Sequence, residues 1–443
     1  MIVNSLTYRT NLPSTTLEQR HAILKRIRHS SSSNEDIQMT NTMKVLDVGS
    51  VTSPKGFVAG ATFAGLKTYA EDKLDLGILL SQQPCTAAGV FTKNHLRSPS
   101  VIVSEEHLAK GRARAVVVNS GIANACVGEQ GYKDAKAMAE KTALHLGLDV
   151  EEVLTCSTGV VGAELPMSLI RNGIDRIEMT KEGGSLLARA ILTTDPGPKE
   201  ITVSFEQEGT TITVAGNAKG AGMIHPNMAT MLSFITTDAN VPADFLQQSL
   251  KEAVDGSFNM MTIDGDTSTN DTVLVFANGA AGAGTITKGS DAASNFESAL
   301  LTVCVELAKS IAFQGEGANK LIEVVVDGAR NLSEARSAAR TIAGSSLVKT
   351  AVHGNDPNWG RIAVALGRAD AEIVEKKMAL YINDVCIMEE GRPVPFHRDS
   401  IVALMAKPHV TFRIALNIGN AQATAWGCNL SEEYVTFNSA YTT

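Results

Sequence analysis

Apolar residues along this chain follow two spacings, one typical of strands and the other of helices. Short runs of β-branched residues in 115–118 and 210–214 predict strands. In 293–311 the apolar residues instead recur at three- and four-residue steps, which places them on one face of a helix that packs on the core. Two further segments, 133–147 and 243–255, also have helical periodicity. Strands and helices alternate, so the pattern predicts a mixed α/β protein.

The second half of the chain adds further strands, several of which alternate apolar and polar residues. Alternation of this kind is typical of a strand with one face in the core and the other facing solvent or covered by a helix. The predicted strands are residues 272–276, 321–326, 380–382 and 410–416. They extend the mixed α/β prediction to the C-terminal half.

Residues 1–43 differ from the rest of the chain, because none of them has the periodicity of a core element. Basic residues between 20 and 28 precede four serines at 30–33. Such a composition resembles a mitochondrial transit peptide, but the acidic residues of the same segment are unusual in one. We therefore expect a disordered extension or an over-long start, with the functional protein beginning at Met39 or Met43, and a cytoplasmic location in preference to the mitochondrial matrix.

The composition is that of a compact enzyme with a large core. The chain has 443 residues, and a single hydrophobic core stops growing at about 250–300 residues. Two domains, or two tightly merged halves, are therefore expected. Hydrophobic residues make up 44% of the chain and aromatic residues only 5%, with 37 glycines. These proportions indicate layers of closely packed small residues rather than an aromatic binding surface.

Charge and cysteine content exclude several classes of function. The formal net charge is −8, so no general attraction to nucleic acid or to an anionic membrane is expected. No apolar run approaches the roughly 18 residues that a membrane-spanning helix needs. The six cysteines contain no Cys-x-x-Cys pair, and the nine histidines contain no His-Glu-x-x-His. We therefore expect no metal site.

The most informative segment is a loop of small residues that leads into one hydroxyl, Thr230. Gly220 and Gly222 allow unusual backbone conformations, Pro226 stiffens the chain, and residues 231–235 predict a buried strand. If the bond before Thr230 is cut, the new N-terminal threonine carries both a nucleophilic oxygen and an amine with a pKa of about 7.7–8.0 that can act as its base. An ordinary tight turn fits the same features.

Several short motifs rich in glycine and small polar residues are spaced along the chain. One is KGAGM at 219–223, followed by ATML at 229–232. The others are STGVVG at 157–162, TTD at 193–195, DGDTSTNDT at 264–272, GEGA at 315–318 and HGNDPNWGR at 353–361. In content and order these motifs resemble those of the ornithine acetyltransferases of arginine biosynthesis, and the resemblance covers about residue 46 to the end of the chain.

The resemblance implies that the chain cuts itself between Ala229 and Thr230. It would thus divide into fragments 44–229 and 230–443, and Thr230 would carry the acetyl group. It also implies an oxyanion hole made by Thr158 and Gly159, whose hydroxyl and backbone N–H are suitable donors to a developing alkoxide. The alternative for Thr158 is the N-cap of a helix.

Substrate contacts are also implied by the resemblance, and they are Thr193, Lys219, Thr230, Glu316, Asn438 and the C-terminal Thr443. The sequence does not decide between Thr193 and Thr194. From charge complementarity we hypothesise that Lys219 binds a substrate carboxylate and Glu316 a substrate ammonium group. Without the resemblance, both would be interpreted as ordinary surface charges.

Two further motifs and three departures change this picture little. Residues 264–266 are interpreted as a structural turn, because their carboxylates do not have the spacing of an EF-hand. Residues 353–361 are interpreted as a polar loop that packs beside the site. The family commonly has other residues at Ile122, Pro196 and Asn319. These departures affect the shape of the pocket more than the reaction.

The family's properties complete the expectation. The resemblance implies a four-layer α/β sandwich, not a doubly wound sheet, whose two fragments are intertwined and assemble as α2β2. It implies no metal or organic cofactor, and it leaves open acetyl-CoA as a second acetyl donor. The partners are then small molecules, N-acetylornithine and glutamate, and neither nucleic acid nor a membrane.

The expected reaction is ping-pong acetyl transfer from N2-acetyl-L-ornithine to L-glutamate through an acetyl-Thr230 ester. The nearer alternative is an N-terminal-nucleophile amidohydrolase or aminopeptidase, in which water removes the acyl group. The further alternative is a binding protein in which residues 219–222 hold an anion and Thr230 is inert.

Overall fold

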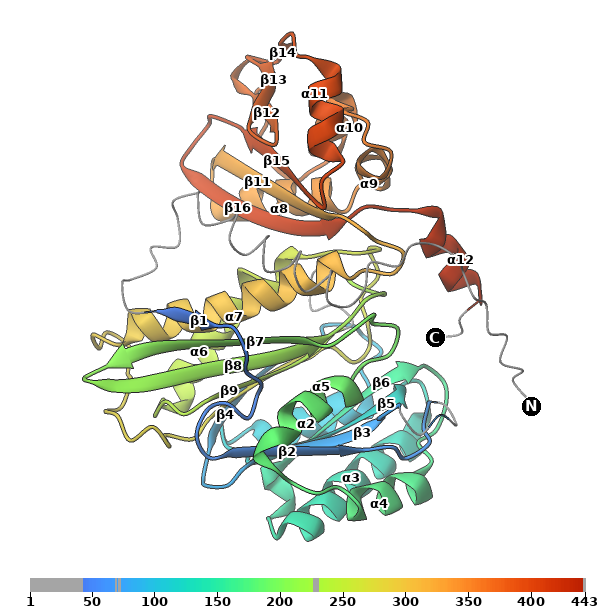
Figure 1. Ribbon diagram of the computed structural model, residues 1–443, viewed down its shortest axis with the longest axis vertical. Helices are drawn as coiled ribbons and strands as arrows, with labels where there is room; N and C mark the ends of the chain where they lie inside the picture. Colours follow the sequence, from blue (N-terminus) through green and yellow to red (C-terminus); the bar gives the residue numbers. More distant parts are fainter. Residues whose placement is uncertain (1–42, 68–69, 71–72, 226–230, 441–443) are drawn as a thin grey trace. The chain divides into compact units, whose positions relative to one another are not determined.

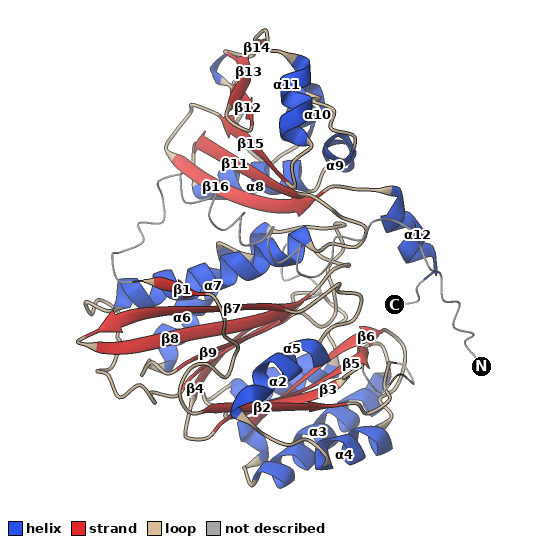
Figure 2. Cartoon of the chain, in the orientation of Figure 1, coloured by secondary structure: helices blue, strands red, loops and turns tan. Residues whose placement is uncertain are grey.

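The computed structural model describes residues 43–67, 70, 73–225 and 231–440, and the structural statements below refer to these residues. The chain divides into two compact units, Met1–Asp36 and Ile37–Thr443. All described residues belong to the second unit, and they form three sheets with helices between and around them (Figure 2). The predicted extension 1–43 lies outside the described residues except for Met43.

The first sheet has six strands in the order β1-β7-β8-β9-β10-β4, and Figure 1 labels all of them except β10. The strands are β1 Lys44–Leu46, β4 Thr86–Phe91, β7 Lys199–Gln207, β8 Thr210–Lys219, β9 Leu232–Thr237 and β10 Thr272–Ala277. Only β9 and β10 are parallel. Leu232 pairs with Lys219 on one side and with Thr272 on the other. The end of β8 therefore lies beside the beginnings of β9 and β10.

The second sheet has four strands in the order β2-β3-β5-β6. The strands are β2 Phe57–Thr62, β3 Leu76–Ser81, β5 Ala115–Ile122 and β6 Val153–Val160. β5 and β6 run parallel, and their register becomes irregular at Gly121 and Ile122. β6 is an edge strand of this sheet, which leaves every second carbonyl on its outer side available to other partners.

The two sheets pack face to face between two layers of helices. Along β5, Val116 and Val118 belong to the core between the sheets. Val117 belongs to a second core, which the sheet shares with α3 Gly128–Leu146 and α4 Met167–Asp175. On the far face of the first sheet lie α6 Ala243–Asp255 and α7 Ala293–Phe313. The predicted four-layer sandwich is therefore confirmed.

The longest helix, α7, is buried on more than one side. Phe296, Leu300, Val303 and Leu307 are all 0–1% exposed, as their spacing predicts. α7 packs against β7 and β8 of the first sheet and against β11 Leu321–Ala329 and β16 Ala421–Cys428 of the third. The helix thus connects the sandwich to the third sheet. The predicted helices at 133–147, 243–255 and 293–311 are confirmed to within a few residues.

The third sheet has the order β14-β13-β12-β15-β11-β16. Its remaining strands are β12 Ala379–Ile382, β13 Val385–Glu389, β14 Arg392–Pro393 and β15 His409–Ala415. The other helices are α2 Pro99–Leu108, α5 Gly184–Ala190, α8 Leu332–Ala343, α9 Ser346–His353, α10 Trp359–Gly367, α11 Arg398–Met405 and α12 Glu432–Ala440. The strands predicted in the second half all occur.

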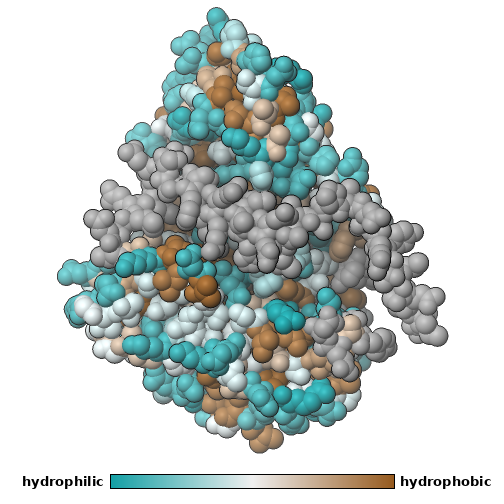
Figure 3. All heavy atoms as spheres, in the orientation of Figure 1, coloured by the Kyte–Doolittle hydropathy of each residue, from teal (hydrophilic) through white to brown (hydrophobic). Residues whose placement is uncertain are grey.

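Polar residues cover much of the molecular face in Figure 3, with small groups of apolar residues between them. Within the described residues, no helix has the length and apolar content needed to cross a bilayer.

Candidate active site

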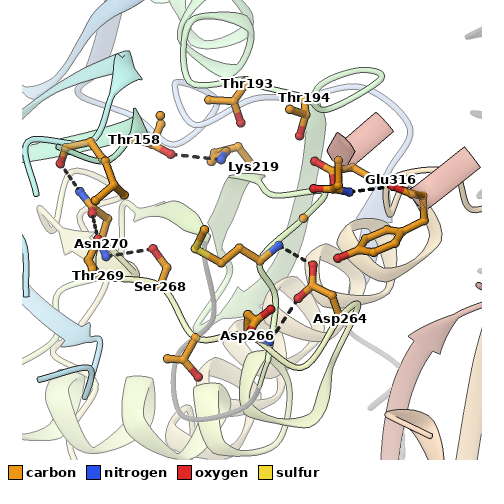
Figure 4. Close-up of a pocket in the computed structure, with 18 residues that line it drawn as sticks. Thr158, Thr193, Thr194, Lys219, Asp264, Asp266, Ser268, Thr269, Asn270 and Glu316 are labelled. Carbon is orange, nitrogen blue, oxygen red and sulfur yellow. Dashed lines mark hydrogen bonds between the residues drawn. The ribbon is translucent and has the colours of Figure 1, made fainter. Parts of the chain in front are cut away.

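A cavity of about 380 Å³ opens where β6 and β8 end, next to the segment that leads into β10 (Figure 4). Seven of the residues considered for the oxyanion hole or for substrate contact line it: Thr158, Gly159, Thr193, Thr194, Lys219, Glu316 and Asn438. They come from positions up to 280 residues apart, so the fold brings together the motifs that the sequence separates. Thr193 and Thr194 both line the cavity.

Thr158 and Gly159 are among the last three residues of β6. Thr158 is 3% exposed and lies inside the strand, so the alternative that it caps a helix is wrong. Gly159 has a φ of +131°, and a Cβ there would lie 2.1 Å from the carbonyl carbon of Gly121. Only glycine can adopt this conformation at so close a backbone approach.

Lys219 is the last residue of β8, and its side chain is enclosed by the cavity wall. It is 2% exposed, and its Nζ donates to Thr158 Oγ1 over 3.2 Å. Burial lowers the pKa of Lys219, while Asp195, Asp271 and Glu316 oppose this by favouring the ammonium form. The Lys219 side-chain nitrogen therefore lies within hydrogen-bond distance of a threonine hydroxyl.

Asp195 joins two walls of the cavity, a role that the sequence did not indicate. Its Oδ1 accepts from Lys199 Nζ over 2.5 Å and from Gly220 N over 2.6 Å, while Oδ2 accepts from Thr193 N over 3.2 Å. The side chains of Asp195 and Lys199 are fully buried. Burial alone would raise the pKa of Asp195, but Lys199, Lys219 and these hydrogen bonds outweigh it and lower the pKa to about 2.

Glu316 provides negative charge at another part of the cavity wall. It follows α7, and its backbone N donates to Ala221 O over 2.8 Å. Its Oε2 accepts from Asn438 Nδ2 over 2.8 Å. A Cβ at Gly222 would lie 2.4 Å from the same Oε2. The glycine-rich loop therefore needs its small residue to leave room for the carboxylate.

Asp264 holds the other end of the glycine-rich loop. Its Oδ2 accepts from Met223 N over 2.6 Å, and its Oδ1 accepts from Ile224 N over 2.8 Å. Met223 has a φ of +57°, a conformation unusual for a residue with a side chain. Burial raises the pKa of Asp264, against the effect of these hydrogen bonds. No group of side chains suited to a metal ion occurs within the described part of the chain.

The residues expected at the cut, Ala229 and Thr230, lie outside the described residues, as does Thr443. The next residue, Met231, is described and is 1% exposed. Its backbone N donates to Oδ1 of the fully buried Asp271 over 3.0 Å. Burial raises the pKa of Asp271 well above its usual range.

The segment 353–361 does not line the cavity and is a loop only in part. It spans the last residue of α9, a short connection and the first residues of α10. Its first residue, His353, has its Nε2 3.3 Å from Glu432 Oε2 at the start of α12. Because α12 also carries Asn438, this contact connects the segment to the cavity only indirectly.

The arrangement suits an amino-acid substrate and an acyl-transfer reaction. A buried ammonium group and a carboxylate in one cavity can bind the opposite charges of an amino acid. A hydroxyl and a glycine N–H at a strand end can stabilise a negative oxygen. The sequence missed Asp195 and Asp271, for which the only signals were their places inside the TTD and DGDTSTNDT motifs.

Known proteins similar to this chain share most of its length. The model of the ArgJ family matches residues 58–443. The arginine biosynthesis bifunctional protein ArgJ of Dehalococcoides mccartyi is 49% identical over 405 residues, which cover 91% of this chain and all of that protein. The Bacillus subtilis protein of the same name is 43% identical over 408 residues, covering 92% of this chain and all of the relative. A crystal structure of the Bacillus halodurans ArgJ protein is 44% identical with a TM-score of 0.47, covering 48% of this chain and all of that one.

Proposed function

This chain belongs to the ArgJ family and is an acyltransferase of arginine biosynthesis, and we propose that it transfers acetyl from N2-acetyl-L-ornithine to L-glutamate through an ester on Thr230. One observation carries the proposal. Thr158, Lys219 and Glu316 line a single cavity although they are distant in the sequence. The glycine-rich loop that leads toward Thr230 forms part of its wall through Gly222 and Met223.

In the first step the Thr230 hydroxyl attacks the acetyl carbonyl of N-acetylornithine. The free α-amine of the processed Thr230 takes the hydroxyl proton and passes it to the departing amine of ornithine, as the acetyl C–N bond breaks. The carbonyl oxygen becomes negative and is stabilised by the Thr158 hydroxyl and the Gly159 N–H, each donor being worth roughly 3 kcal/mol.

Lys219 helps Thr158 to act as a donor. Because the ammonium group of Lys219 donates to Thr158 Oγ1, that oxygen already accepts a hydrogen bond from one side. The hydroxyl proton of Thr158 is then free to point at the substrate oxygen. Lys219 thus has two roles in this proposal, because it also binds the substrate α-carboxylate.

In the second step L-glutamate enters the cavity that ornithine has left. Its amine attacks the ester carbonyl, the C–O bond to Thr230 breaks, and the proton returns to the Thr230 oxygen. N-acetylglutamate leaves, and the enzyme is restored without a metal or an organic cofactor. Where acetyl-CoA serves as a second donor, we propose that it acetylates Thr230 in the same way.

The proposed cut at Ala229–Thr230 separates the chain into fragments 44–229 and 230–443. Both fragments would contribute to the first sheet, because β8 precedes the cut and its neighbour β9 follows it. The oxyanion donors and Lys219 belong to the first fragment, whereas Glu316 and Asn438 belong to the second. We propose that two such fragment pairs associate as α2β2.

The proposal is tested by intact mass and by a transfer assay. We expect the mass of a fragment that begins at Thr230, and the appearance of N-acetylglutamate from N-acetylornithine and glutamate. A single uncut chain after prolonged incubation would contradict the mechanism. Release of acetate without N-acetylglutamate would favour the amidohydrolase, and an uncut, inert chain would favour the binding protein. Replacing N-acetylornithine by acetyl-CoA tests whether the enzyme has two donors.

A further inference from the structure

The outer edge of β6 is covered by side chains that donate to alternate carbonyls. In a strand, every second carbonyl points to the same side, and an uncovered edge leaves these groups without partners. The pairs are His107 Nδ1 to Val153 O at 2.7 Å, Ser104 Oγ to Thr155 O at 2.6 Å and Asn270 Nδ2 to Ser157 O at 2.8 Å. The first two donors belong to α2, whereas the third comes from the segment before β10.

Of these three donors, Asn270 is the one that lines the cavity, and all the polar atoms of its side chain are engaged. It is 4% exposed. The second hydrogen of its amide is donated to Ala123 O, just beyond the end of β5, over 2.6 Å. Its Oδ1 accepts from Thr269 Oγ1 over 2.5 Å. Asn270 has no donor left for a substrate, so its contribution must act through the backbone that it holds.

The backbone held by Asn270 lies where the pairing of β5 and β6 becomes irregular. The register of β5 and β6 becomes irregular at Gly121 and Ile122. Gly159 faces Gly121 at a separation that leaves no room for a side chain. The amide of Asn270, bound to Ala123 O and Ser157 O, ties the two strand ends together here. It acts beside the backbone hydrogen bond from Ala123 N to Val160 O over 2.9 Å and a donation from Ser98 Oγ to Ala123 O over 3.1 Å.

Fixing Ser157 O also orients Thr158. The carbonyl of Ser157 and the N–H of Thr158 belong to one planar peptide unit, so an anchored oxygen restricts the whole plane. The direction of the Thr158 side chain and of the following N–H, that of Gly159, depends on that plane. These are the two groups proposed to donate to the oxyanion.

We propose that Asn270 is a positioning residue of the oxyanion hole, holding the ends of β5 and β6 so that Thr158 and Gly159 keep their aim during acyl transfer. This inference rests on the proposed function. Asn270 should affect the rate of acetylation and not the affinity for the substrate, because its side chain has no free donor for the substrate.

The test compares Asn270→Ala and Asn270→Ser with the matched control Ser104→Ala. Ser104 donates to the carbonyl of Thr155, on the same edge of β6 and two residues before Ser157. Loss of the Ser104 hydroxyl therefore also leaves a buried carbonyl unpaired, but away from the oxyanion. We expect the Asn270 variants to lower kcat roughly 10- to 100-fold, since a small misplacement of reacting groups costs about that much. KM for N-acetylornithine should stay within about twofold in all three variants, and Ser104→Ala should keep the kcat of the unsubstituted enzyme.

Single-turnover acetylation of Thr230, followed by mass spectrometry, separates positioning from folding. A positioning role slows acetylation in every chain, whereas a merely structural role lowers the fraction of chains that react and leaves their rate unchanged. Unchanged rates in the Asn270 variants would overturn the inference. So would an equal loss of rate in Ser104→Ala, or failure of both Asn270 variants to fold. If the unsubstituted enzyme transfers no acetyl group, it is the proposed function that fails.

Discussion

At the scale of single residues, the cavity is organised by charges that are buried and paired. Burial lowers the pKa of Lys219, and the nearby Asp195 is the first of the groups that oppose this effect. Asp195 stays ionised because Lys199 is bound to it in full burial. Buried charges of this kind are costly unless they are paired. Asp195 therefore connects a buried ion pair to the cavity wall, through its hydrogen bonds to Gly220 N and Thr193 N.

Replacement of Glu316 by glutamine tests its proposed contact with the substrate ammonium group. A hydrogen bond to a charged group is worth about 1.5–3 kcal/mol, so kcat/KM for N-acetylornithine should fall roughly 10- to 100-fold. Steady-state kinetics measure the change, and Glu129→Gln, an exposed carboxylate on α3, is the control. An unchanged dependence on N-acetylornithine in Glu316→Gln would show that the ammonium group binds elsewhere.

Asp195 should make the free energy of unfolding depend on pH. Its pKa is about 2 in the folded protein, below the value of about 3.9 for an exposed aspartate. The carboxylate therefore contributes stability above pH 4, up to about 2 kcal/mol, and this contribution is lost as the pH falls from about 4 to 2. Urea unfolding of the native protein and of Asp195→Asn should differ at pH 7, and the difference should shrink toward pH 3.

The asparagine variant also leaves Lys199 buried without its carboxylate. Adding Lys199→Met to Asp195→Asn should therefore recover part of the lost free energy of unfolding at pH 7. If Asp195→Asn is as stable as the native protein at pH 7, the pair of Asp195 and Lys199 does not stabilise the fold as the lowered pKa of Asp195 indicates.

At the scale of elements, the ends of β5, β6 and β8 create the site. The strands pair regularly through the core, and functional groups appear where pairing ends: Thr158 and Gly159 on β6, and Lys219 on β8. Strand ends can present side chains and N–H groups that regular pairing would otherwise use. The glycines at these ends allow the close backbone approach that the geometry requires.

Gly159→Ala should damage this strand end. The added methyl group would meet the carbonyl of Gly121, and the φ of +131° is unfavourable for alanine. Conformations of this type cost about 1–3 kcal/mol even without a clash. We expect a lower melting temperature and loss of transfer by more than about 100-fold, as for removal of an oxyanion donor. Gly367→Ala is the control, because a Cβ there meets nothing within 4 Å and its φ is ordinary. Normal transfer by Gly159→Ala would remove Gly159 from the oxyanion hole.

At the scale of the whole molecule, the cut proposed before Thr230 falls between neighbouring strands of one sheet. β8 pairs with β9 over residues 214–219, and β10 pairs with β4. Each of these pairs joins the two proposed fragments. Cleavage would therefore remove a covalent connection without removing the hydrogen bonds and the core that hold the fragments together.

After cleavage, the two fragments should remain associated and unfold as one unit. Gel filtration in native buffer should give a single peak that contains both fragments, and calorimetry should give one main transition. The same preparation should show two bands on a denaturing gel, whereas Thr230→Ala should show one. Separation of the fragments in native buffer would contradict the shared sheet.

Particular elements show how far the sequence allowed prediction. The periodicity of 293–311 predicted α7 and its buried face, and the β-branched run at 115–118 predicted part of β5. The loop around Gly222 was recognised as the key segment. The sequence does not indicate the role of Asp195, because its bond to Gly220 N spans 25 residues and no local pattern links the two positions. Segment 353–361 was expected beside the site but does not line the cavity.

By itself, the sequence determined the elements, the family and the residue types of the site, because local periodicity and motif order are properties of neighbouring residues. Only the tertiary structure decided which buried charges meet, how the loop around Gly222 makes room for Glu316, and that Asn270 holds the ends of β5 and β6. These facts depend on contacts between residues up to about 150 positions apart. Such contacts arise from the packing of sheets and helices, which no local pattern encodes.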